Sequence, residues 1–215
     1  MRQAQIHLLC VACTVVVVAC SSRAEPSISS ETPPAAPHAT SETPPAAPEA
    51  TSAPTQSADA VALAEANAAA DELGGALRTR LLAAMREGGP PLAIDVCTNE
   101  ASTITATVAE HRGARVGRGS LRMRGATQAP AWVAAWLREQ GERPAAGVVG
   151  FARVEDGHAR VLRPIAIDAP CLSCHGDAIA PAVSALLAER YPNDRAIGYQ
   201  LGDLRGALYA EVDVR

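Results

Sequence analysis

Glu155-Asp156-Gly157-His158 separates two apolar segments, Val148–Val154 and Ala159–Ile167. An Asp-Gly pair between such segments predicts a β-hairpin with a tight turn, because both turn positions need a positive φ. Farther along, residues 208–215 alternate between apolar and polar side chains, which predicts a half-buried strand. The C-terminal part of the chain is therefore predicted to form an antiparallel sheet.

Helical segments come before this sheet and interrupt it. Asp59–Glu87 is rich in Ala and Leu and lacks proline, and Gly88-Gly89-Pro90-Pro91 is predicted to stop this helix. Leu92–Arg112 predicts a second helix, with Gly113 as its C-cap. Two shorter helices are predicted, at Pro130–Gln140 and from about Ala178 to Arg190. Helices followed by an antiparallel sheet with further helices between its strands indicate an α+β fold.

A C-x-x-C-H motif, Cys171-Leu172-Ser173-Cys174-His175, carries the clearest chemical information. Two thiols at this spacing can add to the two vinyl groups of one haem, and the adjacent histidine can then bind the iron. The motif is the signature of covalent c-type haem attachment. Two alternatives remain open, a Cys3His zinc site completed by Cys97 and a dithiol redox pair. We expect one covalent haem c at Cys171 and Cys174, with His175 as an iron ligand.

The N-terminus predicts export. Leu8–Ala19 is a short apolar stretch, too short to span a bilayer as a helix of about 20 residues. Val17-Val18-Ala19-Cys20 resembles the lipobox of bacterial lipoproteins, so residues 1–19 are expected to be a signal peptide and Cys20 to carry lipid. A plain secretory signal with a chance cysteine is the alternative. The expected location is the periplasmic face of a membrane, and Ser21 favours the outer membrane where the organism has one.

Residues 20–57 differ in composition from the rest of the chain. Pro, Ala, Ser, Thr and Glu dominate, and the eleven-residue unit Ser30–Thr40 recurs at 41–51 with one change, Glu49 in place of His38. Such a segment cannot bury a core, so we expect a disordered, semi-rigid tether. Residues 58–215 are long enough for a single domain with a hydrophobic core.

The charge balance bears on partners. All 19 basic residues are arginine, 23 residues are acidic, and the formal net charge is −4. No basic excess indicates nucleic acid as a partner. The expected contacts are the membrane, through the lipid anchor, and a redox or signalling protein that the sequence does not identify.

A second ligand on the iron has to come from upstream, because no Met, His, Cys or Lys follows His175. The candidates are Met85, Cys97, His111, Met123 and His158. His158 lies in the predicted hairpin turn. His111 lies about 21 Å from Cys97 along the same predicted helix, so only one of the two can face the iron. The methionines more often fill gaps in a core. Cys97 is the leftover thiol, and an inert buried cysteine remains the alternative.

Five motifs occur together in a fixed order: Ala93–Cys97, Val116–Arg124, Cys171–Gly176, Tyr191–Tyr199 and Gly202–Ala207. Together they resemble a bacterial family of uncharacterised haem-c proteins built on a PAS-like domain. The similarity covers nearly all of residues 58–215. It implies a PAS-like antiparallel sheet with N-terminal helices, and iron ligation by His175 and Cys97. One departure is Gly125-Ala126, where relatives tend to have Asn-Pro, so the loop there is expected to differ.

An arginine-rich run accompanies these motifs: Arg112, Arg115, Arg118, Arg122 and Arg124. Guanidinium forks suit haem propionates, and Arg118 and Arg122 are the preferred candidates because they lie inside a resembling motif. A solvated, charged strand face is the alternative.

A Cys97 thiolate would favour the oxidised iron, and on reduction Cys97 could take a proton and leave. This chemistry suits a sensor of redox state or of a small gas. An electron-transfer cytochrome is the alternative function. Catalysis such as peroxide reduction would need an open distal side with acid–base groups, so we do not expect an enzyme.

Overall fold

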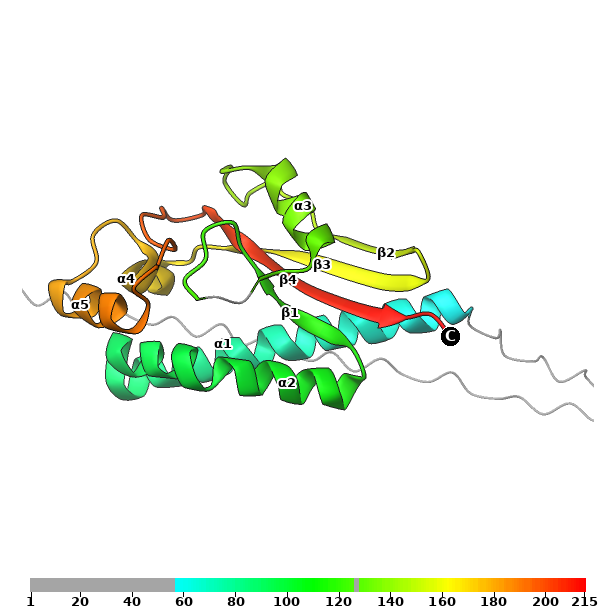
Figure 1. Ribbon diagram of the computed structural model, residues 1–215, viewed down its shortest axis with the longest axis horizontal. Coiled ribbons are helices and arrows are strands. Elements are labelled where there is room, and N and C mark those ends of the chain that lie inside the picture. Colours follow the sequence, from blue (N-terminus) through cyan, green and yellow to red (C-terminus); the bar gives the residue numbers. More distant parts are fainter. Residues whose placement is uncertain (1–56, 126–127) are drawn as a thin grey trace, which may run out of the picture. The chain divides into compact units, whose positions relative to one another are not determined.

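The computed structural model describes residues 57–125 and 128–215. This part of the chain contains a four-stranded antiparallel sheet in the order β1-β4-β3-β2. The strands are β1 (Arg115–Gly119), β2 (Phe151–Glu155), β3 (His158–Ala166) and β4 (Leu204–Asp213). Helices precede the sheet and lie between its strands (Figure 1), so the predicted α+β fold is confirmed. None of the described helices is both long and apolar enough to cross a membrane.

The predicted hairpin joins β2 and β3. Asp156 and Gly157 both have positive φ, 52° and 75°, as a type I′ turn requires. The pairing of Glu155 with His158 closes the ladder directly at this turn. β2 begins at Phe151 rather than at Val148, and the Val149 side chain is 80% exposed. Val148, where the predicted strand starts, is buried, but it lies before β2 rather than in it.

The N-terminal helices form a hairpin of their own. α1 (Ala58–Asn99) contains a kink at Gly89, whose φ of 65° and ψ of −158° are non-helical. The chain returns along its own path from this point, because Ala93 and Val96 pack against Ala84. The residues predicted to stop the helix thus mark the point where α1 reverses its direction. The predicted helix Leu92–Arg112 is divided at Glu100 into the end of α1 and α2 (Ala101–Arg112).

Side-chain pairing holds the two arms of this helical hairpin together. The Arg80 guanidinium donates two hydrogen bonds of 2.7 Å to the Glu100 carboxylate, where α1 passes into α2. Near the other end, the Arg112 Nε lies 2.5 Å from the Glu72 carboxylate. Gly113 follows with φ 57° and ψ 36°, so the predicted C-cap is confirmed.

Helices cover both faces of the sheet. On one face, α1 buries Ala66 and Leu73 against Val161 and Ala210. On the other, α3 (Ala131–Gln140) contributes a cluster that includes Val133, Leu137, Leu162 and Ala207. Figure 1 shows the two layers on opposite sides of β3 and β4. The predicted half-buried strand is therefore covered on both sides.

The covering of both faces of the sheet also affects Glu211 on β4. Its side chain is one of the polar groups that the sequence pattern predicts to face solvent, yet the residue is only 9% exposed. It accepts hydrogen bonds from Arg115 Nε at 2.7 Å and Arg160 Nε at 2.6 Å. These pairs make its burial tolerable, because a buried carboxylate without a partner would be costly.

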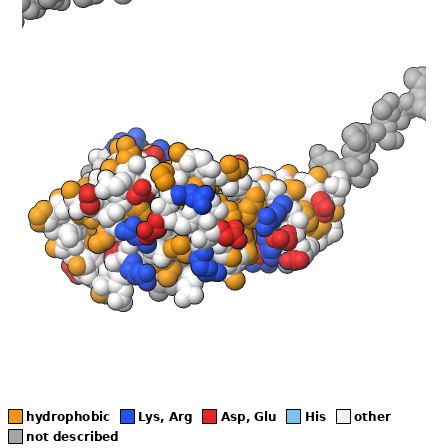
Figure 2. Space-filling view, turned by 90° about the horizontal axis from the view of Figure 1, so that it is seen from above, with side chains coloured by type: hydrophobic (Ala, Val, Ile, Leu, Met, Phe, Trp, Pro, Cys, Tyr) orange, Lys and Arg blue, Asp and Glu red, His pale blue; other side chains and the backbone are white. Residues whose placement is uncertain are grey.

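Arginine and histidine supply every cation of the ion pairs in the described residues. Figure 2 shows basic and acidic side chains interspersed over the face that it draws. This mixture fits the small net charge and leaves no broad basic surface on that face.

The C-x-x-C-H motif lies after β3, in the short elements η1 (Ala169–Cys171) and α4 (Leu172–His175). α5 (Pro181–Arg190) follows, and it begins at Pro181 rather than at Ala178 because proline favours the first turn of a helix. Val183 and Leu187 of α5 pack on Ile94 of the returning arm of α1. The motif is thereby placed beside the α1 reversal (Figure 1).

Candidate functional site

The two motif thiols are free and half-buried. Cys171 packs against the cluster of Ile167, Ala196 and Tyr199. Cys174 packs against the different cluster around Ile94. Both sulfurs therefore lie on one short helical turn, with an apolar support behind each.

His175 is held by the loop that follows α5. Its Nδ1 lies 2.6 Å from the carbonyl oxygen of Ala196. A carbonyl oxygen can only accept, so Nδ1 carries the proton and Nε2 keeps its lone pair. The backbone N–H of Tyr199 also donates to the His175 carbonyl at 2.9 Å. This tautomer and this second contact are what a metal-binding histidine requires.

The electrostatic surroundings keep His175 neutral. Burial lowers the pKa of His175 to about 3, and the positive charges of Arg205, Arg124 and Arg118 contribute, against the opposing hydrogen bond to Ala196. A neutral imidazole is the form that binds iron. The same cations mark this end of the protein as a place where negative charge is stabilised.

Cys97 lies near the motif on the returning arm of α1, where it is exposed. It follows Ile94 by one helical turn, and Ile94 shares a cluster with Cys174. Burial raises the pKa of the Cys174 thiol, Arg124 opposes this, and charge on Cys97 and Cys171 raises it further. Cys97 and Cys171 are thus close enough to Cys174 for their charges to affect the pKa of its thiol.

Within residues 57–125 and 128–215, no group of three or more His, Cys, Asp and Glu side chains is placed to hold a metal ion. The Cys3His zinc alternative would need Cys97, Cys171, Cys174 and His175 to converge. The structure therefore gives no support to that alternative.

The other ligand candidates lie in different surroundings. At the end of α2, His111 Nδ1 is 2.9 Å from the carboxylate of Glu72 on α1. His158 Nδ1 is 2.8 Å from Asp213, at the end of β4. His158 is thus a paired residue at the start of β3, directly after the turn. Met85 packs inside the α1 hairpin. The backbone of Met123 accepts a hydrogen bond of 2.9 Å from the Arg195 N–H, beside the loop that holds His175.

Three members of the arginine-rich run are engaged with carboxylates. Arg112 pairs with Glu72, and Arg115 pairs with Glu211 and Asp213. Arg124 pairs with Asp194 at 2.8 Å, where the two side chains are only 12% and 9% exposed. Their charges are thus already matched within the protein.

Arg124 also binds the backbone on either side of the site. Its Nη2 donates to the carbonyl oxygen of Cys174 and, at 3.3 Å, to that of Ala196. Arg124 therefore joins the motif to the loop that binds His175 Nδ1.

Arg122 and Arg118 lie near His175 without a carboxylate partner in the described part of the chain. The Arg122 guanidinium stacks on Tyr199, 4.2 Å from the ring centroid, and donates to the carbonyl oxygens of Arg195 and Ile197. Arg118 is exposed on β1, and its positive charge helps to lower the pKa of His175. Both cations remain available for an anionic group.

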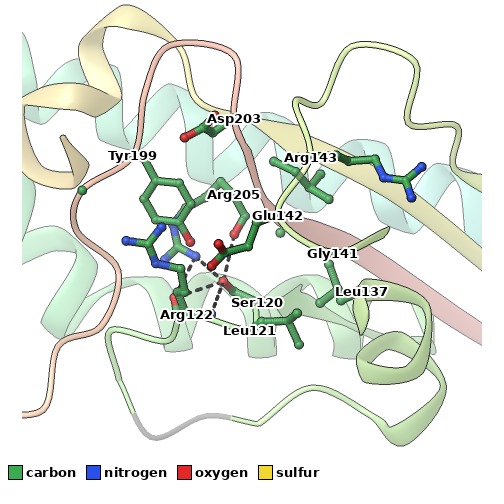
Figure 3. Close-up of a pocket in the computed structure, with 13 residues that line it drawn as sticks. Ser120, Leu121, Arg122, Leu137, Gly141, Glu142, Arg143, Tyr199, Asp203 and Arg205 are labelled. Atoms are coloured by element: carbon green, nitrogen blue, oxygen red, sulfur yellow. Dashed lines mark hydrogen bonds between the residues drawn. The ribbon is translucent and has the colours of Figure 1, made fainter. Parts of the chain in front are cut away.

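A cavity of about 210 Å³ lies beside this cluster (Figure 3). Arg122, Tyr199 and Arg205 form part of its wall, and Ser120 hydrogen-bonds to the two arginines. The ring of Tyr199 also meets that of His175 edge-on, with centroids 6.2 Å apart and an interplanar angle of 84°. Arg205 and Tyr199 were not singled out from the sequence, although both lie inside the resembling motifs.

These residues fit a haem. Two free thiols precede a histidine whose Nε2 is available, and the guanidinium groups of Arg118 and Arg122 near that histidine could pair with the propionates of a haem. The donor set is the one that c-type attachment uses.

The fold and the site together define an α+β protein with a C-x-x-C-H site at one end of an antiparallel sheet. Residues 45–212 match the model of the Tll0287-like family (Tll0287). The chain belongs to this family.

One solved relative is the cyanobacterial heme-protein Tll0287, seen in a crystal structure. It is 27% identical to this chain, with a TM-score of 0.44, and the match covers 53% of this chain and 69% of that protein. Comparison with curated proteins found no match.

Proposed function

We propose that the chain binds one haem covalently through Cys171 and Cys174, with Nε2 of His175 as an axial ligand. In each attachment the thiol adds to a vinyl group, so that a sulfur–carbon bond forms and the thiol hydrogen passes to the other vinyl carbon. The observation that carries the proposal is the 2.6 Å contact between His175 Nδ1 and the Ala196 oxygen, because it prepares Nε2 for iron. The description of a relative as a heme-protein supports it.

Cys97 is the second axial ligand in this proposal. Its support is its place one turn beyond Ile94, which packs with Cys174, and the effect of its charge on the Cys174 pKa. Met123 is the nearest alternative because its backbone adjoins the His175 loop. Arg118 and Arg122 are proposed to bind propionates, and the domain is proposed to be PAS-like.

Haem supplies a one-electron couple and a position where a small molecule can bind. The protein's own contribution is a thiolate that stabilises the oxidised state and a Cys97 Sγ that can take up a proton when that stabilisation weakens. Cys97 is exposed, so solvent can deliver that proton. A labile, solvent-accessible thiol favours a sensor of redox state or of a small gas.

An electron-transfer cytochrome is the second candidate. Ile197 and Leu201 follow the His175 loop and are 44% and 66% exposed. Exposed apolar side chains beside a redox centre suit a transient docking surface. We propose no enzymatic activity. Export with a lipid on Cys20 is part of the proposal, and Cys20 and the tether lie outside the described residues.

The attachment is tested with protein produced in a host that matures c-type cytochromes. Haem should stay with the protein during acid–acetone extraction, and Cys171→Ala or Cys174→Ala should each leave a single thioether. Haem in the organic layer, or zinc in place of a Soret band, would refute the proposal.

The two roles differ in the reduced protein. A sensor should bind carbon monoxide once Cys97 leaves, and its electron self-exchange should be slow. If the reduced protein binds no carbon monoxide and exchanges electrons rapidly, the electron-transfer role is correct.

A further inference from the structure

Arg205 is fixed at the start of β4 by Ser120. Its Nη1 donates to the Ser120 hydroxyl at 2.6 Å and to the Arg122 carbonyl at 3.2 Å. The carbonyl of Arg205 in turn lies 2.8 Å from the same hydroxyl. Figure 3 shows these bonds converging on Ser120 at the wall of the cavity. The position of the guanidinium is thus determined by neutral groups.

No carboxylate offsets this charge. Within residues 57–125 and 128–215, the Arg205 side chain has no Asp or Glu oxygen in ion-pair range, although the residue is partly buried. The comparison with other partly buried arginines is direct, since Arg124 pairs with Asp194 and Arg160 pairs with Glu211. A buried guanidinium that lacks a counterion is costly.

The surroundings increase that cost. Burial lowers the pKa of Arg205, the Tyr199 hydroxyl opposes this, and the charges of Arg124 and Arg118 lower it further. Guanidinium nevertheless stays protonated in proteins. The cavity therefore holds a preformed positive site whose charge is balanced by no ion pair in the described part of the chain.

The cavity connects this site to the proposed haem. The Tyr199 ring centroid lies 4.2 Å from Arg122 Cζ and 5.5 Å from Arg205 Cζ, and the ring also meets that of His175 edge-on. The cavity also carries Glu142 and Asp203. Asp203 accepts a hydrogen bond of 2.7 Å from the backbone N–H of Gln200. Glu142 forms no ion pair with any of the described residues. Glu142 is the internal group that could compete for Arg205.

We propose that Arg205, set by Ser120 and flanked by Arg122, receives a carboxylate in this cavity. The carboxylate has two possible sources, a propionate of the attached haem or a small free carboxylate such as malonate. The contact of Tyr199 with both Arg205 and His175 favours the propionate. The inference rests on the proposed haem attachment.

The experiment compares the haem-loaded protein with Arg205→Gln and Arg143→Gln. Arg143 is a matched control, because it lines the same cavity but is exposed and hydrogen-bonds to the carbonyl oxygens of Gln140 and Glu139. The readouts are the propionate bending band in resonance Raman spectra and the heat of malonate binding. Glu142→Gln tests the internal competitor. If Arg205→Gln does not accumulate, Arg205→Lys replaces it and should give a smaller change of the same sign.

If a propionate binds Arg205, the bending band should differ from the wild-type band in Arg205→Gln and in neither Arg143→Gln nor Glu142→Gln. The wild-type protein should then bind no malonate. Malonate binding that is lost in Arg205→Gln, with an unchanged band, identifies the free carboxylate as the source. An unchanged band without malonate binding overturns the inference, as does a band shift of equal size in Arg143→Gln. A band shift in Glu142→Gln as large as in Arg205→Gln would also overturn it, by assigning Arg205 to Glu142. Extraction of the wild-type haem by acid–acetone would instead refute the proposed function.

Discussion

The hydroxyl oxygens of Thr98 and Tyr191 lie 2.8 Å apart. Thr98 Oγ1 also donates to the carbonyl oxygen of Ile94 at 2.8 Å. Because a hydroxyl has one proton, Tyr191 must be the donor between the two hydroxyls. This bond fixes the turn of α1 that carries Cys97 to the residue that follows α5. The position of Cys97 is therefore set by a tertiary contact and not by its helix alone.

Replacing Thr98 by valine tests that contact. The free energy of unfolding should fall by about 0.5–1.5 kcal/mol, the usual value of one hydrogen bond, and the haem spectrum should indicate a less uniform sixth ligand. Thr105→Val is the control, because the Thr105 hydroxyl bonds only to Ala101 in its own helix in the described structure. Urea unfolding and absorption spectra make the comparison, and equal effects of both substitutions would contradict the assignment.

Replacing Cys97 by alanine should leave covalent haem in place. The long-wavelength charge-transfer band of the ferric thiolate should disappear, and the midpoint potential should rise because an anionic donor stabilises ferric iron. Since about 59 mV corresponds to a tenfold change for one electron, we expect a rise on the order of 100 mV or more. His111→Ala, which removes a partner of Glu72, should change neither quantity. A silent Cys97→Ala beside an altered Met123→Ala would show that methionine is the ligand.

Replacing Asp194 by asparagine should weaken the support of His175. It removes the charge partner of Arg124 while keeping the shape of the side chain. Breaking a buried pair on one side costs about 3–5 kcal/mol, so we expect a loss near the lower end and less attached haem. Asp71→Asn breaks the exposed pair with Arg163 and should cost about 1 kcal/mol or less. Chemical unfolding and the haem-to-protein ratio measure both variants, and similar losses would argue against a role of the Arg124–Asp194 pair in supporting His175.

Acid should destabilise the protein partly through Glu211. Burial works to raise the pKa of this carboxyl, but hydrogen bonds from Arg160 and Arg115 outweigh it and the pKa lies below its usual 4.5. A lowered folded-state pKa means that the contribution is present above pH 4.5 and is lost as the pH falls through the folded-state value. Glu211→Gln should therefore be less stable at pH 7 and show a shallower loss in acid. Urea midpoints from pH 7 to pH 3 test this, and parallel curves would contradict it.

The proposed lipid on Cys20 predicts a change of compartment. Cys20→Ala should release the haem protein from the membrane fraction or leave it as an unprocessed precursor of larger size. Fractionation and mass spectrometry of the membrane-bound and soluble forms provide the measurement. A Cys20→Ala product that remains membrane-bound at unchanged mass would contradict lipidation.

Local signals in the sequence were sufficient for much of the fold. The Asp156-Gly157 turn and the Gly113 cap depend on a few adjacent residues, and both are confirmed. The coverage of β4 by α3 could not be predicted, because it depends on packing between segments far apart in the chain. Glu211 shows the consequence, since its burial depends on Arg115 and Arg160.

The same distinction applies to the candidate site. The C-x-x-C-H spacing is local, and it indicates the thiols and His175 directly. The Ala196 carbonyl has no side-chain signal at all, and the unpaired charge of Arg205 becomes visible only when its neighbours are known. The roles proposed for Cys97, Arg118 and Arg122 stay predictions.

The absence of lysine, which leaves the ion pairs of the described residues to arginine and histidine, also decides how this protein can be handled. Acylating reagents, amine-reactive dyes and amine-coupled sensor surfaces all require lysine or a free N-terminus, and this chain has no lysine. If the α-amino group of Cys20 is acylated as well as its sulfur lipidated, the mature protein would offer such reagents no primary amine. Attachment to a surface or a fluorophore would then have to use carboxylates or an engineered tag. Guanidinium also keeps its charge in alkali where an ammonium group would lose it. The arginine ion pairs should therefore set no upper limit on working pH.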